Sequence, residues 1–149
     1  MKLQQLSLFL ENRPGQLRIP CAALAGAGID VLTMSLADTA QFGILRLIVA
    51  DWQRAKEVLE AACSVVNVTE VVPIEVDDRP GGLAEALERI EGAGLGIEYM
   101  YAFARGPKPG KAAIVFRFED ADRALAAVKA RGLRVLAAED LIGASAGPR

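Results

Sequence analysis

The stretch Asn12-Arg13-Pro14-Gly15-Gln16-Leu17 returns further along the chain as Asp78-Arg79-Pro80-Gly81-Gly82-Leu83. Each copy follows a segment in which apolar residues alternate and precedes a segment with the apolar spacing of a helix. A capping Asn or Asp, a proline and a glycine in this place indicate a helix start held close to the end of a strand. Because the surrounding apolar pattern returns with the loop, the two copies predict a duplicated unit, which is stronger evidence than either motif alone.

The elements of the first half follow from apolar periodicity. Alternation at Leu6, Leu8 and Leu10 predicts a first strand. A helix with Leu17, Cys21 and Leu24 on one face follows, and Cys21 is expected to be a small core residue. The remaining elements are strands over residues 30–39 and from residue 42 onward, a helix capped by Asp51, and a strand from residue 65 that continues through Val72 to Val76.

The second half repeats this order with the same classes of core residue. The offset that relates Asn12 to Asp78 holds as far as Met34 and Met100, and it is three positions larger where Leu45 corresponds to Ile114. The extra positions fall in the segment 105–111. Each half reads strand-helix-strand-strand-helix-strand, which predicts an α+β fold of two ferredoxin-like βαββαβ units in tandem. We expect antiparallel sheets with the helices on one face, domains at residues 1–71 and 72–149, and sheets paired side by side.

Pro20 departs from the repeat, because the equivalent residue of the second half is Ala86. A proline inside a helix removes one backbone hydrogen bond and costs about 3 kcal/mol, although the cost is smaller in the first turn. We expect a loosened or kinked helix start in the first half only. The alternative is a helix that starts one turn later.

Composition excludes several classes of function. The formal net charge of −2 argues against nucleic acid or an anionic membrane as the main partner. The N-terminus is too polar for a signal peptide and no apolar run has the length of a membrane span, which predicts a cytoplasmic protein. The chain has no histidine, and its two cysteines, Cys21 and Cys63, lie far apart in the sequence, so we expect neither a disulfide framework nor a metal site nor a cofactor.

The unit order, the repeated Pro-Gly loop, the Ala-Gly-Ile/Leu end of the first helix and the strand opening Phe42-Gly43-Ile44-Leu45-Arg46 resemble the ACT domain. The resemblance covers residues 3–72 and 72–142. It implies a regulatory module without catalytic activity that binds a small ligand, usually an amino acid, between paired domains. The loop positions that would contact this ligand are Asn12, Arg13, Pro14, Gly15, Gln16 and Leu17 in the first copy, and Asp78, Arg79, Pro80, Gly81, Gly82 and Leu83 in the second. The strand positions facing a neighbouring domain would be Met34, Ser35, Leu36, Met100 and Tyr101.

An amino acid also suits the chemistry of the first loop. Backbone N–H groups at Gly15 or Gln16 can receive its carboxylate, and the side-chain oxygen of Asn12 can receive its ammonium. An apolar slot against Leu17 can hold an aliphatic side chain. In the second loop, Asp78 adds a negative charge that opposes the carboxylate, which Arg79 could offset. We therefore expect two unequal sites, and the sequence does not decide which one is competent.

Other functions fit parts of the pattern. Tyr99, Tyr101 and Phe103 alternate as the aromatic residues of an RNA-binding sheet do, although the acidic composition favours packing. Arg13 and Arg79 leave open an acylphosphatase-like hydrolase. A scaffold whose Pro-Gly loops are only turns is the main alternative to ligand binding. For the regulatory function we expect a homodimer and a separate regulated enzyme or transporter.

Overall fold

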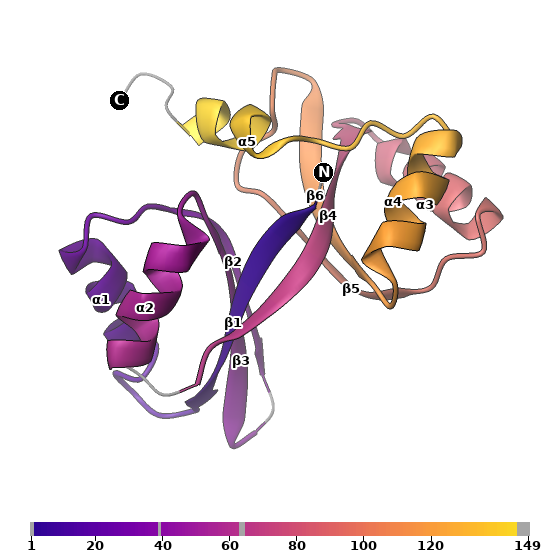
Figure 1. Cartoon of the computed structure of the whole chain (residues 1–149). Helices are drawn as coiled ribbons and strands as arrows, with labels where there is room; N and C mark the ends of the chain where they lie inside the picture. Colours follow the sequence, from indigo (N-terminus) through magenta and orange to yellow (C-terminus); the bar gives the residue numbers. More distant parts are fainter. Residues whose placement is uncertain (1, 39, 63–64, 146–149) are drawn as a thin grey trace. The chain divides into compact units, whose positions relative to one another are not determined.

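The first half of the chain folds in the strand and helix order that the sequence predicts, and the second half follows the same order through its second helix (Figure 1). The computed structural model describes residues 2–38, 40–62 and 65–145. The elements of the first half are β1 (Leu3–Glu11), α1 (Arg18–Gly26), β2 (Val31–Asp38), β3 (Phe42–Val49), α2 (Trp52–Ala62) and β4 (Asn67–Asp77). Those that follow are α3 (Gly82–Gly92), β5 (Ile97–Ala102), β6 (Lys111–Phe118), α4 (Ala121–Ala130) and α5 (Ala138–Ser145).

These elements form two compact units. The first unit is Gln4–Thr69, and the second is Glu70–Arg149 together with Met1–Leu3. Strand β4 contributes residues to both, because it runs without a break from the end of one repeat into the start of the next. The side-by-side pairing of the two sheets stays a prediction.

In the first unit, β3 lies between β1 and β2 and pairs with both in antiparallel register. Leu45 lies opposite Leu8 on one side and Leu36 on the other. Every second residue of β1 and β3 points toward the two helices, as the alternation predicts. The buried core consists of Leu6, Leu8, Leu10, Leu24, Leu45, Leu47, Val49, Ala55, Leu59 and Val66.

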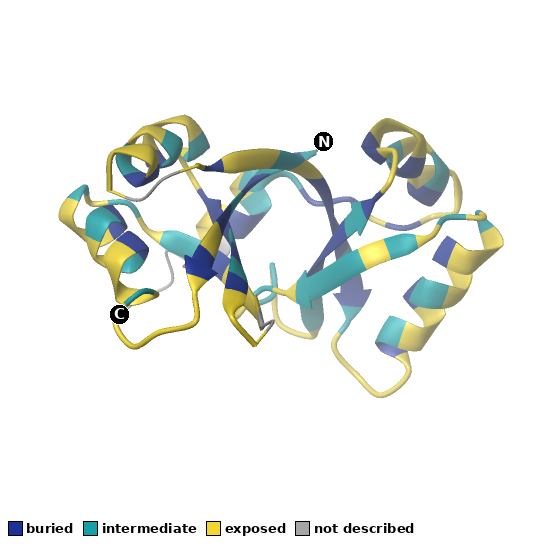
Figure 2. Ribbon diagram, turned by 90° about the horizontal axis from the view of Figure 1, so that it is seen from below, coloured by how far each residue is buried: buried dark blue, intermediate teal, exposed yellow. Residues whose placement is uncertain are grey.

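The second unit repeats this register at the expected offsets. Ile114 of β6 lies opposite Ile74 of β4 and Ala102 of β5. Figure 2 shows the buried residues on the strands and on the helix surfaces that face them. The buried core consists of Val72, Ile74, Val76, Ala86, Ile90, Ile114, Phe116, Phe118, Ala124, Val128, Leu133 and Val135. The tandem βαββαβ architecture is therefore confirmed.

Equivalent residues form the same turns and helix caps in the two units. Gly15 and Gly81 both have a φ of +88°, a left-handed conformation that favours glycine. Asp51 and Asp120 begin α2 and α4, and each side chain accepts a hydrogen bond from the N–H three residues later, at 3.1 and 3.0 Å. Both offsets read from the sequence are thus present in the backbone geometry.

The first helix begins late rather than with a kink. Helix α1 starts at Arg18, whereas α3 starts at Gly82, whose equivalent in the first half is Gln16. Pro20 is therefore the third residue of α1, where a missing N–H costs little, and it is buried. The expectation that Cys21 is a small core residue is wrong, because Cys21 is half-buried and does not belong to the core of the first unit. Cys63 lies outside the described residues.

The end of the second unit differs from the repeat. The last predicted strand is reduced to a bridge between Ile74 and Val135, with Leu136 N–H donating to the Pro73 carbonyl at 2.9 Å. Helix α5, which the periodicity did not predict, lies on the other side of β4 and β6 from α3 and α4 (Figure 1). It buries Leu141 and has no equivalent in the first unit, where the chain continues as β4.

Candidate functional site

The first Pro-Gly loop is fastened to the turn between β2 and β3. Asn12 N–H donates to the Gln41 carbonyl at 2.9 Å, and Asn12 Nδ2 donates to the Ala40 carbonyl at 3.4 Å. The expectation that Asn12 caps a helix is wrong, because the residue before α1 is Leu17 and α1 has no side-chain cap. The side chain holds two loops together instead.

A cavity of about 150 Å³ lies beside this loop. It is lined by Leu10, Glu11, Asn12, Arg13, Leu17, Leu36 and Gly43. Four predicted positions, Asn12, Arg13, Leu17 and Leu36, thus surround one space. Leu17 and Leu36 are 38% and 49% exposed, so a ligand or a neighbouring chain would remove apolar surface from water there.

Other predicted positions of the first set do not line this cavity. No atom of the described residues lies within 4 Å of a Cβ built on Gly15, so its backbone is open to approach. Gln16 N–H donates to the Arg13 carbonyl at 3.2 Å and stabilises the turn after Pro14. Met34 is exposed on the Leu36 side of β2, and Ser35 lies opposite Arg46 on the other side of the sheet.

Three lining residues were missed by the sequence reasoning. Leu10 ends the alternating strand and Glu11 follows it, so both could have been found by extending the loop toward its N-terminus. Gly43 has a steric role, because a Cβ there would lie 2.9 Å from Leu36 Cδ1. The equivalent pair in the second half is Ala112 with Ala102, in which the smaller partner leaves room for a methyl group.

The charges beside the cavity are balanced within the loop. Arg13 Nε lies 2.6 Å from Glu11 Oε2, and both side chains are more than half exposed. An exposed pair of this kind contributes little to stability, and either partner can exchange it for a bound ligand. The first site therefore combines an apolar wall, an amide and an exchangeable ion pair.

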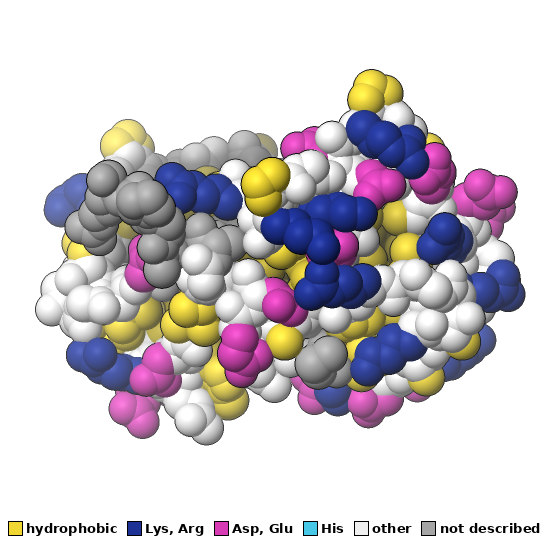
Figure 3. Space-filling view, turned by 90° about the horizontal axis from the view of Figure 1, so that it is seen from above, with side chains coloured by type: hydrophobic (Ala, Val, Ile, Leu, Met, Phe, Trp, Pro, Cys, Tyr) yellow, Lys and Arg dark blue, Asp and Glu magenta, His cyan; other side chains and the backbone are white. Residues whose placement is uncertain are grey.

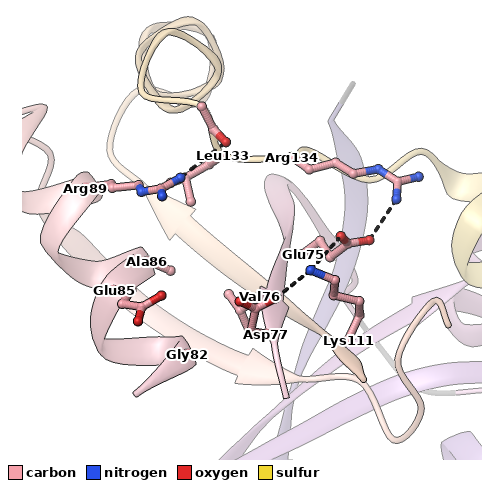
Figure 4. Close-up of a pocket in the computed structure, with 11 residues that line it drawn as sticks. Glu75, Val76, Asp77, Gly82, Glu85, Ala86, Arg89, Lys111, Leu133 and Arg134 are labelled. Carbon is pink, nitrogen blue, oxygen red and sulfur yellow. Dashed lines mark hydrogen bonds and ion pairs between the residues drawn. The ribbon is translucent and has the colours of Figure 1, made fainter. Parts of the chain in front are cut away.

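The second Pro-Gly loop has the same backbone, but ion pairs lie beside it, and Figure 4 shows those that Lys111 and Arg134 make next to Gly82. Arg79 Nη2 donates to both oxygens of Glu85 at 2.8 and 2.9 Å, and also lies 3.3 Å from Asp77. The Glu85 carboxylate raises the pKa of Arg79. Arg79 is therefore engaged away from Asp78, whose charge it was expected to offset.

Lys111 extends this network across β4 and β6. Its Nζ donates to Asp77 at 2.5 Å and lies 3.9 Å from Glu75, whose side chain is only 8% exposed. Arg134 Nη1 lies 2.8 Å from the same Glu75. The hydrogen bond between Lys111 and Asp77 raises the pKa of Lys111 and lowers the pKa of Asp77. Figure 3 shows Lys and Arg side chains gathered over this unit, with acidic side chains between them.

The remaining predicted positions of the second set do not share one cavity. Gly82 lines a polar pocket of about 190 Å³, together with the network residues and Arg89. Leu83 and Met100 pack against the core of the unit, and Tyr101 pairs with Val115 on the strand surface that faces away from α3 and α4. The loop residues Pro80 and Gly81 are exposed, and Asp78 N–H donates to the Gly110 carbonyl at 3.0 Å.

A duplicated βαββαβ unit with a Pro-Gly loop at each first helix agrees with a family match over residues 1–144, to a pair of ACT domains. The chain belongs to the ACT domain pair family. ACT domains are regulatory modules. Comparison with curated proteins returns no match.

Solved structures share this architecture. Protein BT0572 from Bacteroides thetaiotaomicron is 38% identical, with a TM-score of 0.86 over 95% of this ACT domain pair and 96% of that chain. The regulatory subunit of aspartate kinase from Thermus thermophilus, in its ligand-free form, is 18% identical and has a TM-score of 0.61. The match covers 87% of this chain and 92% of that subunit. The regulatory subunit of aspartate kinase from Thermus flavus is 20% identical and has a TM-score of 0.59. The match covers 89% of this chain and 94% of that subunit. The last two show the fold alone.

Two further features are absent from the part of the chain that the structure describes, namely a metal-binding cluster and a membrane-spanning helix. There, acidic and cysteine side chains do not gather in groups of three or more that could hold a metal ion. None of the helices in the same residues combines the length and the apolar character needed to cross a bilayer.

Proposed function

We propose that the ACT domain pair is a regulatory protein without catalytic activity, and that its first unit binds an amino acid beside the first Pro-Gly loop. The domains are residues 1–71 and 72–149. The observation that carries this proposal is the cavity bounded by Asn12, Leu17 and Leu36, because polar and apolar side chains line the same space.

Each part of an amino acid finds a matching group in this arrangement. The ammonium is placed at Asn12 Oδ1 and the Glu11 carboxylate, and the carboxylate at the Gly15 N–H and the Arg13 guanidinium. Binding then exchanges the internal ion pair of 2.6 Å between Arg13 and Glu11 for two pairs with the ligand. A small aliphatic side chain suits the space of about 150 Å³ against Leu17 and Leu36.

We assign the second loop a structural role. The carboxylates of Glu85 and Asp77 already occupy Arg79, and Lys111 occupies Asp77. A ligand carboxylate would have to displace these pairs while lying close to Asp78. The same pairing of Arg79 argues against the acylphosphatase-like alternative at the second loop.

The regulatory output belongs to a separate cytoplasmic enzyme or transporter, and the protein acts as a homodimer whose arrangement the ligand shifts. A ligand shifts such an equilibrium only by binding one arrangement more tightly than the other. The aspartate kinase regulatory subunits of Thermus thermophilus and Thermus flavus are a precedent for this fold in a regulatory subunit.

Thermal denaturation in the presence of each of the twenty amino acids tests the proposal. A ligand at a hundred times its dissociation constant stabilises the protein by about 2.7 kcal/mol. We expect a concentration-dependent rise in Tm with one small aliphatic amino acid or a few related ones. An unchanged Tm with all twenty would contradict the proposal and favour a scaffold without a ligand.

A further inference from the structure

The ion-pair network of the second unit has an apolar counterpart in the first. Four of its side chains are Glu75, Glu85, Lys111 and Arg134. Counted with the two offsets between the repeats, the same positions of the first unit hold Phe9, Ile19, Phe42 and Val65. The register supports this assignment, because Val66 and Val135, the next residues along, are both buried in their unit's core.

These four apolar residues, here called the apolar patch, are exposed. The exposed fractions are 63% for Phe9, 41% for Ile19, 48% for Phe42 and 68% for Val65. Phe9, Ile19 and Phe42 line a groove of about 450 Å³ together with Gln16 and Glu11. In the described part of the second unit, by contrast, the one large apolar side chain with comparable exposure is Ile142.

The fold does not require apolar residues at these positions, because the second unit builds equivalent strands with charged side chains there. Four large apolar side chains left in water are an aggregation liability, and such patches mark surfaces that another molecule covers. A cover needed whenever the chain is present is most simply another copy of the chain. We infer that the apolar patch of the first unit is the contact surface of a homodimer.

Charge supports a self-complementary contact. Among the described residues that line the groove, Glu11 is the one ionised group, and Arg13 of the same unit neutralises it at 2.6 Å. A two-fold axis would therefore place apolar surface on apolar surface, with no unmatched charge brought together. A strongly charged partner would find nothing to pair with, whereas the second unit offers only ion pairs at the equivalent surface.

The contact lies next to the proposed ligand site, since Glu11 belongs to both linings. The inference deepens the proposed function by naming the dimer surface, but it does not depend on a ligand being bound.

The double substitution F9E/F42K tests it. It installs in the first unit the Glu and Lys that lie 3.9 Å apart as Glu75 and Lys111 in the second, so the fold is known to accept the pair. The matched control is Ile142→Glu, which charges the exposed apolar residue of α5. Sedimentation velocity of the full chain without amino acids, over a wide concentration range, measures the mass, and circular dichroism checks that each variant is folded.

We expect the mass of two chains for the wild type and for Ile142→Glu. For F9E/F42K we expect the mass of a single chain. The dissociation constant of the dimer should rise about thirtyfold or more, which is the effect of losing one central contact residue of an interface. A wild type that stays a single chain at the highest concentration would overturn the inference, as would a folded F9E/F42K protein that dimerises as tightly as the wild type. A dimer that responds to none of the amino acids would contradict the proposed function alone.

Discussion

The two Pro-Gly loops share one backbone and differ in what surrounds them. Gly15 and Gly81 have the same φ of +88°, yet Arg13 makes one exposed pair whereas Arg79 is held by two carboxylates. The first loop borders an apolar cavity, and the second borders a network of ion pairs. Glycine and proline thus preserved the turn after duplication, while the neighbouring side chains made one copy open and the other closed.

The largest loss of stability is expected from a substitution at the start of α3. A Cβ on Gly82 would lie 1.9 Å from the Asp77 carbonyl, which only a backbone movement can relieve. Gly82→Ala should lower the free energy of unfolding by about 3 kcal/mol or more. The equivalent residue, Gln16, already carries a side chain because α1 starts later, so Gln16→Ala should stay within about 0.5 kcal/mol. Urea denaturation measures both, and equal losses would contradict this difference between the helix starts.

A smaller effect should appear at the cavity wall. Gly43→Ala places a Cβ 2.9 Å from Leu36 Cδ1 and should cost about 1 kcal/mol through overpacking. In Leu36→Ala/Gly43→Ala, which reproduces the Ala102 and Ala112 of the second half, the two changes should couple favourably by about 1 kcal/mol. A double-mutant cycle of unfolding free energies gives this value, and purely additive losses would show that the two residues do not set the size of the cavity.

The smallest effect is expected from the ion pair of Lys111 with Asp77, and it depends on pH. The folded-state pKa of Asp77 is lowered, so this carboxylate stabilises the fold above about pH 4 and loses its contribution as the pH falls through the folded value. The pKa of Lys111 is raised, so its contribution is present below about pH 10 and is lost as the pH rises through the folded value. Lys111→Met should therefore lower Tm at neutral pH.

Melting curves from about pH 3 to pH 8 check this prediction, because the difference between wild type and Lys111→Met should shrink below about pH 4. The control is Lys108→Met, an exposed lysine of the same hairpin, for which the difference should be small and nearly independent of pH. A Lys111→Met difference that persists unchanged at low pH would show that packing, rather than charge, is responsible.

The elements that could be predicted from the sequence are those that both units share. Period-two and period-3.6 patterns located the strands and the first four helices, because both units bury the same face of each element. Helix α5 was missed because it has no equivalent in the first unit. The late start of α1 was left as an alternative, since Pro20 is compatible with a kink and with a first-turn position.

The candidate site was predicted less completely than the fold. Motif reasoning finds the loop, but the cavity also depends on Gly43 and Leu36, which lie on other strands and meet only after folding. The closure of the second loop likewise depends on Lys111 and Glu85, whose role appears only when the side chains are placed. No local sequence pattern indicates which charged residues will form ion pairs when they lie far apart in the sequence.

The most direct test of amino-acid binding at the first loop compares Gly15→Ala with Gly81→Ala by isothermal titration calorimetry. Both residues have a φ of +88° and a Cβ with no atom closer than 3.6 Å, so both variants should lose about 1 kcal/mol of stability through the same backbone strain. The added methyl blocks the ligand only at the open loop. We predict that an amino acid bound by the wild type binds Gly81→Ala equally well and binds Gly15→Ala at least tenfold more weakly. Equal binding by the two variants, or loss of binding in Gly81→Ala alone, would contradict the placement of the site.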